Sequence, residues 1–391
     1  MNLRPAREAL LNPKFMLAVY CVTAAVVTVF KLSGSPIEQN GFHYRPLQNF
    51  AIFRNSFEHL IHHQNIYAPF IAGQWDLFRY SPAFALLFAP FAMLPYSLGA
   101  VLWNLLNAAA LFWAIHAMPG LDERRKMLVL WFIFLAMLTS VENAQSNALT
   151  AALMIGAWNF QERGKSDYAA VFIVLAALIK LFGIFAILPC LLCGDRKRLL
   201  RYLAASAAVF AALPLFVLRY GELILLYRNW YATVAAFNHA RLGISFMGLL
   251  KAWLHLDLPA NYVVAAAAIV LVTTAVIGRH RQVLVLASVL IFVTIFNYAA
   301  ESPSYVIAVS GVALWFFAQR PTPVNLTLLI ATFLFAMLSS TDLFPRTLRH
   351  QILEPYVVKA LPCVLVWFKL QFDLIRDNRV MLKDTHATGS R

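Results

Sequence analysis

The sequence predicts an all-α polytopic membrane protein, from its composition and from the apolar runs that recur along it. Of its 391 residues, 61% are hydrophobic and only 13% are charged. Soluble domains are typically about 45–50% apolar and about 25% charged. No polar stretch in the sequence is long enough to link separate soluble domains. These observations exclude a secreted disulfide scaffold, a disordered chain and an ordinary cytosolic enzyme.

The apolar runs are long enough to cross a bilayer as helices. A hydrocarbon core of about 30 Å needs roughly 17–25 apolar residues in one helix. The first run follows basic residues and has no small-residue cleavage site, which indicates a signal anchor. The predicted spans are 14–31, 97–118, 127–141, 146–160, 200–218, 261–278, 282–299, 304–318, 324–341 and 355–371.

Two more apolar segments are interpreted from the charges that flank them. Segment 168–193 is too long for one span and short for two, and basic residues flank both of its ends. We therefore expect a hairpin of two short helices with Lys180 near its far tip. Segment 81–95, if it crossed, would put the basic residues at 124–126 outside. We therefore expect a re-entrant or juxtamembrane helix that does not cross.

The complete topology has about 12 spans, with both termini in the cytoplasm. The net charge of +14 is then explained by Lys and Arg on the cytoplasmic side, and we expect no nucleic-acid partner. Residues 1–372 form one transmembrane domain, and 373–391 form a cytoplasmic tail. We expect the functional site on the long outer loops, 32–80 and 219–260, because binding residues concentrate on loops held by a rigid scaffold.

The first outer loop contains the leading acid–base candidate. Apolar residues between Phe50 and Ile61 recur at the spacing of an amphipathic helix, which can lie on a membrane surface. Asp76 and Arg79 follow, just before the segment that dips into the membrane. One interpretation is an i,i+3 ion pair that anchors a helix end. The other is that Asp76 is a general base.

The other candidates are polar residues at further outer boundaries. Lys180 lies in an apolar run, where a cation is costly and by default functional. It would bind an anion such as a lipid phosphate, or else snorkel to the headgroups. The turn Glu142-Asn-Ala-Gln-Ser-Asn147 is polar either because a tight turn needs caps or because it binds a sugar. Glu301 is at one more outer boundary.

Motifs of soluble nucleotide chemistry are missing from the sequence. There is no nucleotide-phosphate loop, GxGxxG, HExxH or GxSxG motif, and the inner loops are too short for a nucleotide-sugar domain. We therefore expect chemistry on the outer face, with a substrate carried among the membrane lipids. No cofactor is firmly implied and no residue is assigned to a metal, although a divalent metal stays open.

Several short segments, in this order, resemble the GT-C integral-membrane glycosyltransferases, in particular the polyprenyl-phosphate-mannose-dependent α-mannosyltransferase family. They are Asn65-Ile-Tyr67, Phe78-Arg-Tyr-Ser-Pro82 followed by Pro90 and Pro95, Leu102-Trp-Asn-Leu-Leu-Asn107, Asn143-Ala-Gln-Ser-Asn147 and Ile179-Lys180-Leu-Phe. The resemblance implies a GT-C-like bundle in a bacterial inner membrane. It also implies inverting transfer of mannose, or of another hexose or pentose, from a polyprenyl phosphate to a lipid or glycan acceptor on the extracytoplasmic face.

The resemblance also implies a catalytic base. A first-loop carboxylate would take the proton of the acceptor hydroxyl from within about 3 Å. The early-loop Asp of the family falls on Asn49 here, and an amide cannot act as a base. We therefore predict Asp76, and after it Glu58, in that role. The Lys segment of this chain also lacks the proline of the family, because position 183 is Gly183.

The substrate-binding residues follow from the same resemblance and from the predicted topology. Lys180 and Arg241 would contact the phosphate, with support from His239. Gln145 and Asn147 would contact the sugar. The complete predicted set is Asn49, Arg79, Tyr80, Glu142, Asn143, Gln145, Asn147, Lys180, His239, Arg241 and Glu301.

Two functions of other classes stay open. A non-catalytic polyprenyl-phosphate (sugar) transporter or flippase would use Lys180 and the same outer cations but would need no base. Transporters often have internal repeats and broken helices, and no convincing repeat is evident. A scaffold subunit of an envelope-assembly complex would accommodate Asn49 most easily, and it predicts an apolar outer patch in place of a polar cavity.

Overall fold

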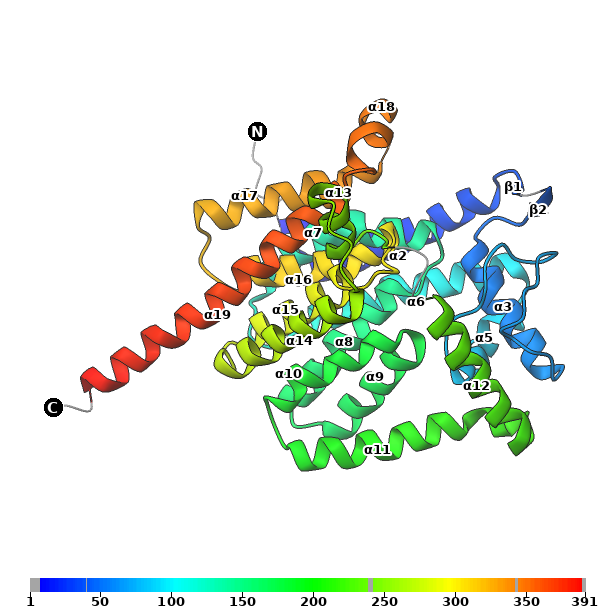
Figure 1. Cartoon of the computed structure of the whole chain (residues 1–391), viewed down its shortest axis with the longest axis horizontal. Helices are drawn as coiled ribbons and strands as arrows, with labels where there is room; N and C mark the ends of the chain where they lie inside the picture. Colours follow the sequence, from blue (N-terminus) through cyan, green and yellow to red (C-terminus); the bar gives the residue numbers. More distant parts are fainter. Residues whose placement is uncertain (1–7, 40, 238–241, 342–343, 389–391) are drawn as a thin grey trace.

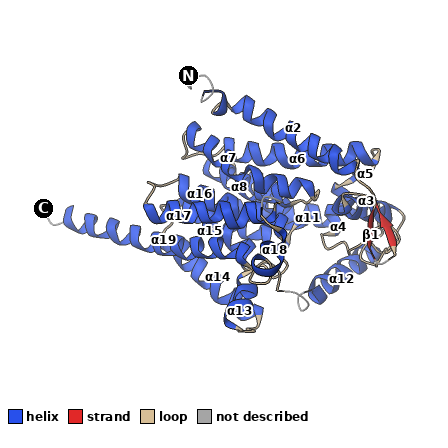
Figure 2. Cartoon of the chain, turned by 90° about the horizontal axis from the view of Figure 1, so that it is seen from above, coloured by secondary structure: helices blue, strands red, loops and turns tan. Residues whose placement is uncertain are grey.

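The computed structural model describes residues 8–39, 41–237, 242–341 and 344–388. Helices make up most of this part of the chain (Figures 1 and 2). Two short strands, β1 (Ile37–Gln39) and β2 (Phe42–Tyr44), pair antiparallel with Glu38 opposite His43. They form a hairpin that precedes the helix Gln48–Ile61 in the 32–80 segment.

The helices follow one another in the order of the predicted apolar runs. The α-helices are α2 (Pro13–Leu32), α3 (Gln48–Ile61), α4 (Pro82–Leu87), α5 (Ala89–Ala92), α6 (Tyr96–His116), α7 (Glu123–Glu142), α8 (Asn147–Glu162), α9 (Ser166–Ile179), α10 (Ile187–Leu191), α11 (Arg196–Ala212), α12 (Tyr220–Phe237), α13 (Phe246–Leu254), α14 (Ala260–Ile277), α15 (Gln282–Ile295), α16 (Tyr305–Phe317), α17 (Pro323–Ala331), α18 (Arg346–Leu348) and α19 (Leu361–Thr388). Short 3₁₀ segments are η1 (Leu181–Ala186), η2 (Leu213–Phe216), η3 (Ser302–Ser304), η5 (Leu338–Ser340) and η7 (Val358–Ala360), and the π-helical segments are η4 (Thr332–Met337) and η6 (Arg349–Leu353).

The core of the bundle is the helix pair α15–α16. Every residue from Leu284 to Ile295 is buried, as is every residue from Tyr305 to Phe316. A helix that is hydrophobic all round is stable only when neighbours cover all of its sides. α15 and α16 pack on each other, and α7, α8 and α19 pack around them. The loop between these two helices is therefore attached at both ends to the buried core.

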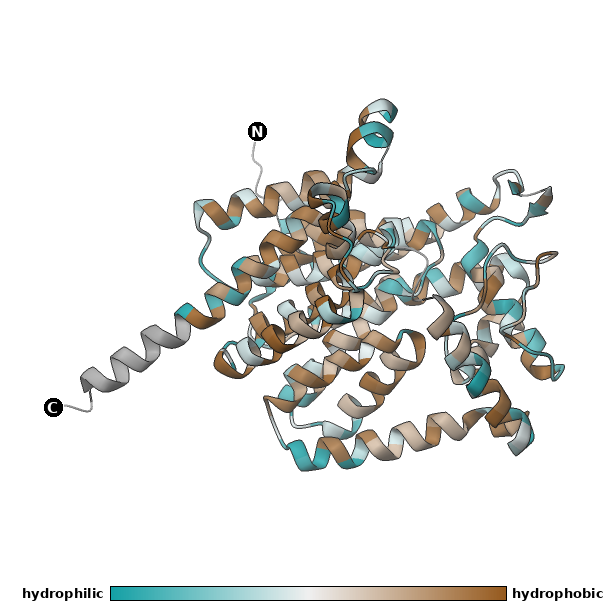
Figure 3. Ribbon diagram, viewed as in Figure 1, coloured by the Kyte–Doolittle hydropathy of each residue, from teal (hydrophilic) through white to brown (hydrophobic). Residues whose placement is uncertain are grey.

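Within the described residues, four helices are long and apolar enough to cross a membrane by themselves. They are Pro13–Leu32, Tyr96–His116, Arg196–Phe216 and Ala260–Ile277. Five more apolar helices have 10–17 residues, and at 1.5 Å per residue they span roughly 15–26 Å. Hydrophobic residues run along α11 beyond its hydrophilic first turn (Figure 3). The chain is a multi-pass membrane protein, but the predicted count of about 12 spans is not confirmed.

The chain reverses at Lys180, where the sequence predicts the tip of a helical hairpin. α9 ends at Ile179, Lys180 is extended with φ −141° and ψ 120°, and η1 begins at the next residue. η1 then packs back against α9. A Cβ atom on Gly183 would lie 2.4 Å from the carbonyl carbon of Ala176. The predicted break is confirmed, and the glycine permits the close return.

The amphipathic helix predicted in the first long loop is α3. Its apolar face is buried and packs on α4 and α5, which occupy the predicted segment 81–95. Ser81 begins α4 by accepting a hydrogen bond from the amide of Phe84. The aromatic rings around Phe53 belong to Tyr80, Phe84, Phe88 and Trp103. With 6 and 4 residues, α4 and α5 are each too short to cross a bilayer.

The last helix continues past the predicted start of the tail. α19 runs without a break from Leu361 to Thr388 and extends away from the bundle (Figure 1). At residue 373 the buried carboxylate of Asp373 forms ion pairs with Lys369 and Arg376. Residues 373–388 are therefore helical, and the cytoplasmic location of this segment stays a prediction.

Substituting Gly183 tests the hairpin. The added methyl of Gly183→Ala has no room against Ala176, so we expect a loss of about 1–3 kcal/mol in stability, typical of overpacking. Thermal unfolding of the purified protein in detergent measures it. Gly221→Ala is the matched control, because no atom lies within 4 Å of its added carbon. Equal melting temperatures for both variants would contradict the close approach at the tip.

Candidate functional site

Five polar side chains that are far apart in the sequence meet at one end of the bundle. They are Asn49, Tyr80, Gln145, Lys180 and Glu301, and we call them the polar cluster. They come from α3, the residues before α4, the α7–α8 turn, the break after α9 and the α15–α16 loop. The structure thus brings together five of the residues that the sequence nominates for substrate binding.

The α7–α8 turn is at the centre of the polar cluster. Ala144 has a positive φ of 47°, and its carbonyl accepts a hydrogen bond of 3.0 Å from the indole of Trp103. The side-chain amide of Asn49 donates to the Asn143 carbonyl at 2.9 Å. The amide nitrogen of Gln145 lies 3.2 Å from Asn49 Oδ1 and 3.4 Å from Glu301 Oε2. One amide group therefore links three segments.

Three side chains of this turn carry buried polar atoms without a hydrogen-bond partner in the described part of the protein. They are Oε1 of Gln145, which is 7% exposed, Oγ of Ser146, which is fully buried, and both Oδ1 and Nδ2 of Asn147, which is 1% exposed. An unsatisfied buried donor or acceptor costs about 1–3 kcal/mol. Water or a polar ligand is the usual partner of such atoms. These amides are therefore ready to bind hydroxyl groups.

Asp76 and Arg79 form a two-point ion pair before α4. The two guanidinium nitrogens donate to the two carboxylate oxygens at 2.5 and 2.8 Å. Asp76 Oδ1 also accepts from the amide of Leu77 at 2.8 Å. The Arg79 carbonyl accepts a 3.1 Å hydrogen bond from the indole of Trp230 on α12. This geometry is the one expected if the pair anchors a helix end. The role of Asp76 as a base stays a prediction.

Tyr80 faces the same turn from the residues before α4. Burial raises the pKa of Tyr80 to about 12, while the nearby Ser146 hydroxyl and the charge of Arg79 lower it. The Tyr80 carbonyl accepts a 2.8 Å hydrogen bond from the hydroxyl of Tyr67. The phenol is therefore neutral near pH 7 and can donate a hydrogen bond.

Lys180 is the cation of the polar cluster. The amide of Ser81 donates to the Leu178 carbonyl at 3.1 Å, which joins the start of α4 to the end of α9. The charges of Glu301 and Arg79 both act on the Lys180 ammonium. This side chain is partly buried, and its nitrogen lies 5.9 Å from the ring centre of Phe182. A cation, a carboxylate and neutral amides thus share one site.

A family model matches the segment that builds this site. It describes glycosyltransferase family 87, and it matches residues 78–341, more than half of the chain. The chain belongs to this family. The matched segment includes every member of the polar cluster except Asn49. Membership of family 87 confirms the predicted class, a glycosyltransferase, but the mannosyltransferase subfamily is not confirmed.

Comparisons with individual proteins add little to the family 87 assignment. No curated protein matches the chain. Among solved structures, the crystal structure of ArnT from Cupriavidus metallidurans bound to undecaprenyl phosphate is similar, with 14% identity and a TM-score of 0.38, over 93% of this chain and 77% of that one. Backbones that differ this much do not allow individual residues to be equated.

The remaining predicted residues lie around the polar cluster or outside the described part of the chain. Glu58 on α3 forms a 2.9 Å ion pair with Arg54, and Glu142 is the last residue of α7. Asn143 contributes its carbonyl to the contact with Asn49. His239 and Arg241 lie outside the described residues. The described residues contain no group of three or more His, Cys, Asp or Glu that could hold a metal.

Sequence reasoning missed the residues that hold the backbone near the site. Trp230 and Tyr67 bond the carbonyls of Arg79 and Tyr80, and the Ser146 hydroxyl lies near that of Tyr80. Ser146 and Tyr67 stand within segments that the sequence had marked, the polar turn and Asn65-Ile-Tyr67, but neither residue was assigned a role. Nothing in the sequence connects Trp230 to a residue about 150 positions earlier.

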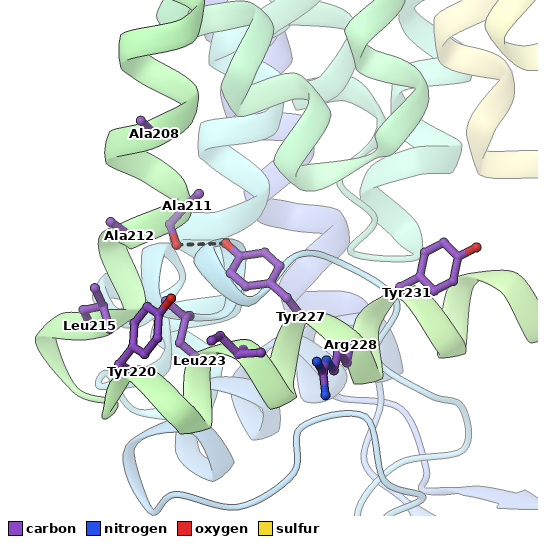
Figure 4. A pocket seen from close by; sticks show the side chains of 10 residues that line it. Ala208, Ala211, Ala212, Leu215, Tyr220, Leu223, Tyr227, Arg228 and Tyr231 are labelled. Carbon is purple, nitrogen blue, oxygen red and sulfur yellow. Dashed lines mark hydrogen bonds between the residues drawn. The ribbon is translucent and has the colours of Figure 1, made fainter.

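An apolar groove runs between α11 and α12 (Figure 4). Its volume is about 620 Å³, and the Tyr227 hydroxyl crosses it to bond the Ala211 carbonyl at 3.1 Å. The lining residues are Ala208, Ala211, Ala212, Leu215, Tyr220, Leu223, Ile224, Tyr227, Arg228 and Tyr231. The ring of Tyr227 also contacts that of Trp230, at 6.0 Å between ring centres. The groove is thus connected through α12 to the backbone of Arg79.

Replacing Asn147 separates stability from substrate binding. Asn147→Leu keeps the size of the side chain and removes two unsatisfied polar atoms, so we expect an equal or higher melting temperature together with loss of sugar transfer. Asn104→Leu is the control, because the Asn104 amide bonds Thr28 and the Val141 carbonyl at 2.7 and 3.0 Å, and its loss should lower the melting temperature. A less stable but fully active Asn147→Leu protein would contradict this role.

Proposed function

We propose that this family 87 protein is a GT-C membrane glycosyltransferase that moves a sugar from a polyprenyl phosphate to a lipid or glycan acceptor on the extracytoplasmic face. The observation that carries the proposal is that Glu301 has two kinds of neighbour. One is a cationic region, Lys180 with Arg79, and the other is the polar turn, where Gln145 and Asn147 carry unpaired amide atoms. The first suits a phosphate and the second suits a sugar. A sugar-transfer reaction needs the phosphate-binding side chains and the sugar-binding side chains in one place.

The phosphate of the donor would bind at Lys180 and Arg79. Negative charge grows on this phosphate as the sugar leaves, so cations placed there stabilise the transition state. Both carboxylate oxygens of Asp76 accept from the guanidinium of Arg79, and this two-point ion pair orients the Arg79 side chain. Arg241 and His239 are further proposed contacts, in agreement with the charge of their loop.

The sugar would bind along the α7–α8 turn. Hydroxyl groups both donate and accept hydrogen bonds, and Asn147 and Gln145 carry the amide atoms that lack partners. Asn49 and the neutral phenol of Tyr80 border the same turn. A site that hydrogen-bonds hydroxyl groups discriminates against sugars that lack them, because its buried polar atoms would stay unpaired. Mannose, or another hexose or pentose, fits this description.

The isoprenoid chain of the donor would occupy the groove between α11 and α12. The groove is lined almost entirely by apolar and aromatic side chains, with Arg228 as a cation on its wall. Only 11% of the apolar window in Arg196–Phe216 is buried within the protein, so this helix faces the lipid. Burial of an isoprenoid chain contributes about 25 cal/mol per Å² of apolar surface. We propose that the protein lies in a bacterial inner membrane with both of its termini in the cytoplasm.

Neutralising Lys180 should weaken donor binding. We expect Lys180→Gln to raise the dissociation constant for polyprenyl phosphate about tenfold or more, because a hydrogen bond to a charged group is worth roughly 1.5–3 kcal/mol. Binding is measured on purified protein in lipid nanodiscs. Lys251→Gln is the control, because Lys251 is an exposed lysine on α13 that pairs with Asp257. Equal dissociation constants for the two variants would remove the phosphate role.

Asp76→Asn distinguishes a base from a residue that positions Arg79. From the two-point ion pair we expect a several-fold higher KM for the donor and a nearly unchanged kcat. A general base contributes about 10²–10⁴-fold to the rate, so a fall of that size in kcat with an unchanged KM would instead identify Asp76 as the base. Labelled polyprenyl-phosphate mannose, with other hexoses and pentoses in parallel, provides the assay.

A further inference from the structure

The loop between α15 and α16 holds Glu301 in a fixed place. The Ile244 amide donates to the Ala300 carbonyl at 2.8 Å, and the hydroxyl of the buried Tyr305 bonds the Ile244 carbonyl at 2.9 Å. The amide of Glu301 itself donates to the hydroxyl of Ser304 at 3.3 Å. Because α15 and α16 form the buried core, the backbone that carries this carboxylate is attached at both ends to buried helices.

Glu301 differs from the other candidate carboxylates in its freedom to accept a proton. Both oxygens of Asp76 accept from Arg79, and Glu58 accepts from Arg54. The only side-chain donor to the Glu301 carboxylate among the described residues is Gln145, at 3.4 Å. No described cation forms an ion pair with it. The backbone amide of Ser304 also donates to the Glu301 side chain in a capping box, and the remaining lone pairs of the carboxylate are available to a substrate hydroxyl.

Glu301 also stands at the boundary between the buried amides and solvent. It is exposed, whereas Gln145 and Asn147 beside it are buried. The charged and titratable groups around it come from four other elements. They are Lys180 and Tyr80, whose ionisation its charge affects, Glu142 at the end of α7, which packs on η3, and Lys359, which bonds the hydroxyl of Ser302. An acceptor that arrives from solvent would meet Glu301 before it reaches the amides.

The contact through Gln145 relates Glu301 to position 49. The nitrogen of this one amide lies 3.2 Å from Asn49 Oδ1 and 3.4 Å from Glu301 Oε2. Asn49 is neutral and cannot take a proton. The negative charge that this part of the site can offer is therefore on Glu301, on the other side of the same amide group.

We infer that Glu301 is the catalytic base of this chain, an assignment that rests on the proposed glycosyl transfer. The acceptor hydroxyl loses its proton to the Glu301 carboxylate while its oxygen forms a bond to the anomeric carbon of the sugar. The bond from that carbon to the phosphate oxygen breaks at the same time. Its electron pair leaves with the polyprenyl phosphate, next to Lys180 and Arg79. Attack opposite the leaving group inverts the anomeric centre.

The test compares Glu301→Gln with Glu354→Gln in lipid nanodiscs. Labelled polyprenyl-phosphate mannose and other hexoses or pentoses serve as donors, with extracted membrane lipids and glycans as acceptors. We expect kcat of Glu301→Gln to fall about 10²–10⁴-fold, with donor KM and the dissociation constant for polyprenyl phosphate unchanged. Glu301→Asp should keep part of the rate because it keeps a carboxylate. Glu354 is an exposed carboxylate that pairs with His350 and is not among the residues of the site, so Glu354→Gln should transfer at the wild-type rate.

Each other outcome contradicts the inference in a distinct way. Wild-type turnover by Glu301→Gln would remove the base, and a kcat loss confined to Asp76→Asn would move it to Asp76. Parallel loss of polyprenyl phosphate binding in Glu301→Gln would make Glu301 a positioning residue. The melting temperature of each variant identifies a failure to fold, in which case the rate of Glu301→Asp decides. A wild-type protein that binds polyprenyl phosphate but transfers no sugar would contradict the proposed function itself.

Discussion

The candidate site depends on the side-chain amide of Gln145, which contacts α3 and the α15–α16 loop from the turn between them. That turn requires a positive φ at Ala144 and a hydrogen bond from Trp103 to its carbonyl. Trp103 in turn packs against the aromatic rings of α3 and α4. The packing of the apolar core and the position of the polar atoms are therefore one arrangement, and neither can shift without the other.

The same site contains groups that lower the stability of the fold. Unpaired amide atoms on Gln145 and Asn147, and a partly buried cation at Lys180, each raise the free energy of the protein without a ligand. Proteins keep such groups where a ligand satisfies them, and they tolerate the loss because the surrounding structure holds the groups in place. Here the support is the buried pair α15–α16 and the close return of the chain at Gly183.

The sequence predicts local features of this protein better than distant contacts. Apolar runs locate the long helices, and flanking charge predicts the break at Lys180, because both signals lie within about 20 residues. The span count is harder, since several apolar helices are shorter than a bilayer. The Asp76–Arg79 pair follows from i,i+3 spacing. Gln145 contacts Asn49, which is 96 positions before it, and Glu301, which is 156 positions after it. No local pattern in the sequence specifies these contacts.

The geometry gives a physical reason for asparagine at position 49. If an acid stood there, as the resemblance to the mannosyltransferase family implies, it and Glu301 would approach the same amide nitrogen of Gln145. Two carboxylates this close repel each other, and the pKa of one of them rises. Asparagine keeps an oxygen for the Gln145 contact and adds a donor for the Asn143 carbonyl. With asparagine at position 49, no second carboxylate at this amide repels the charge of Glu301.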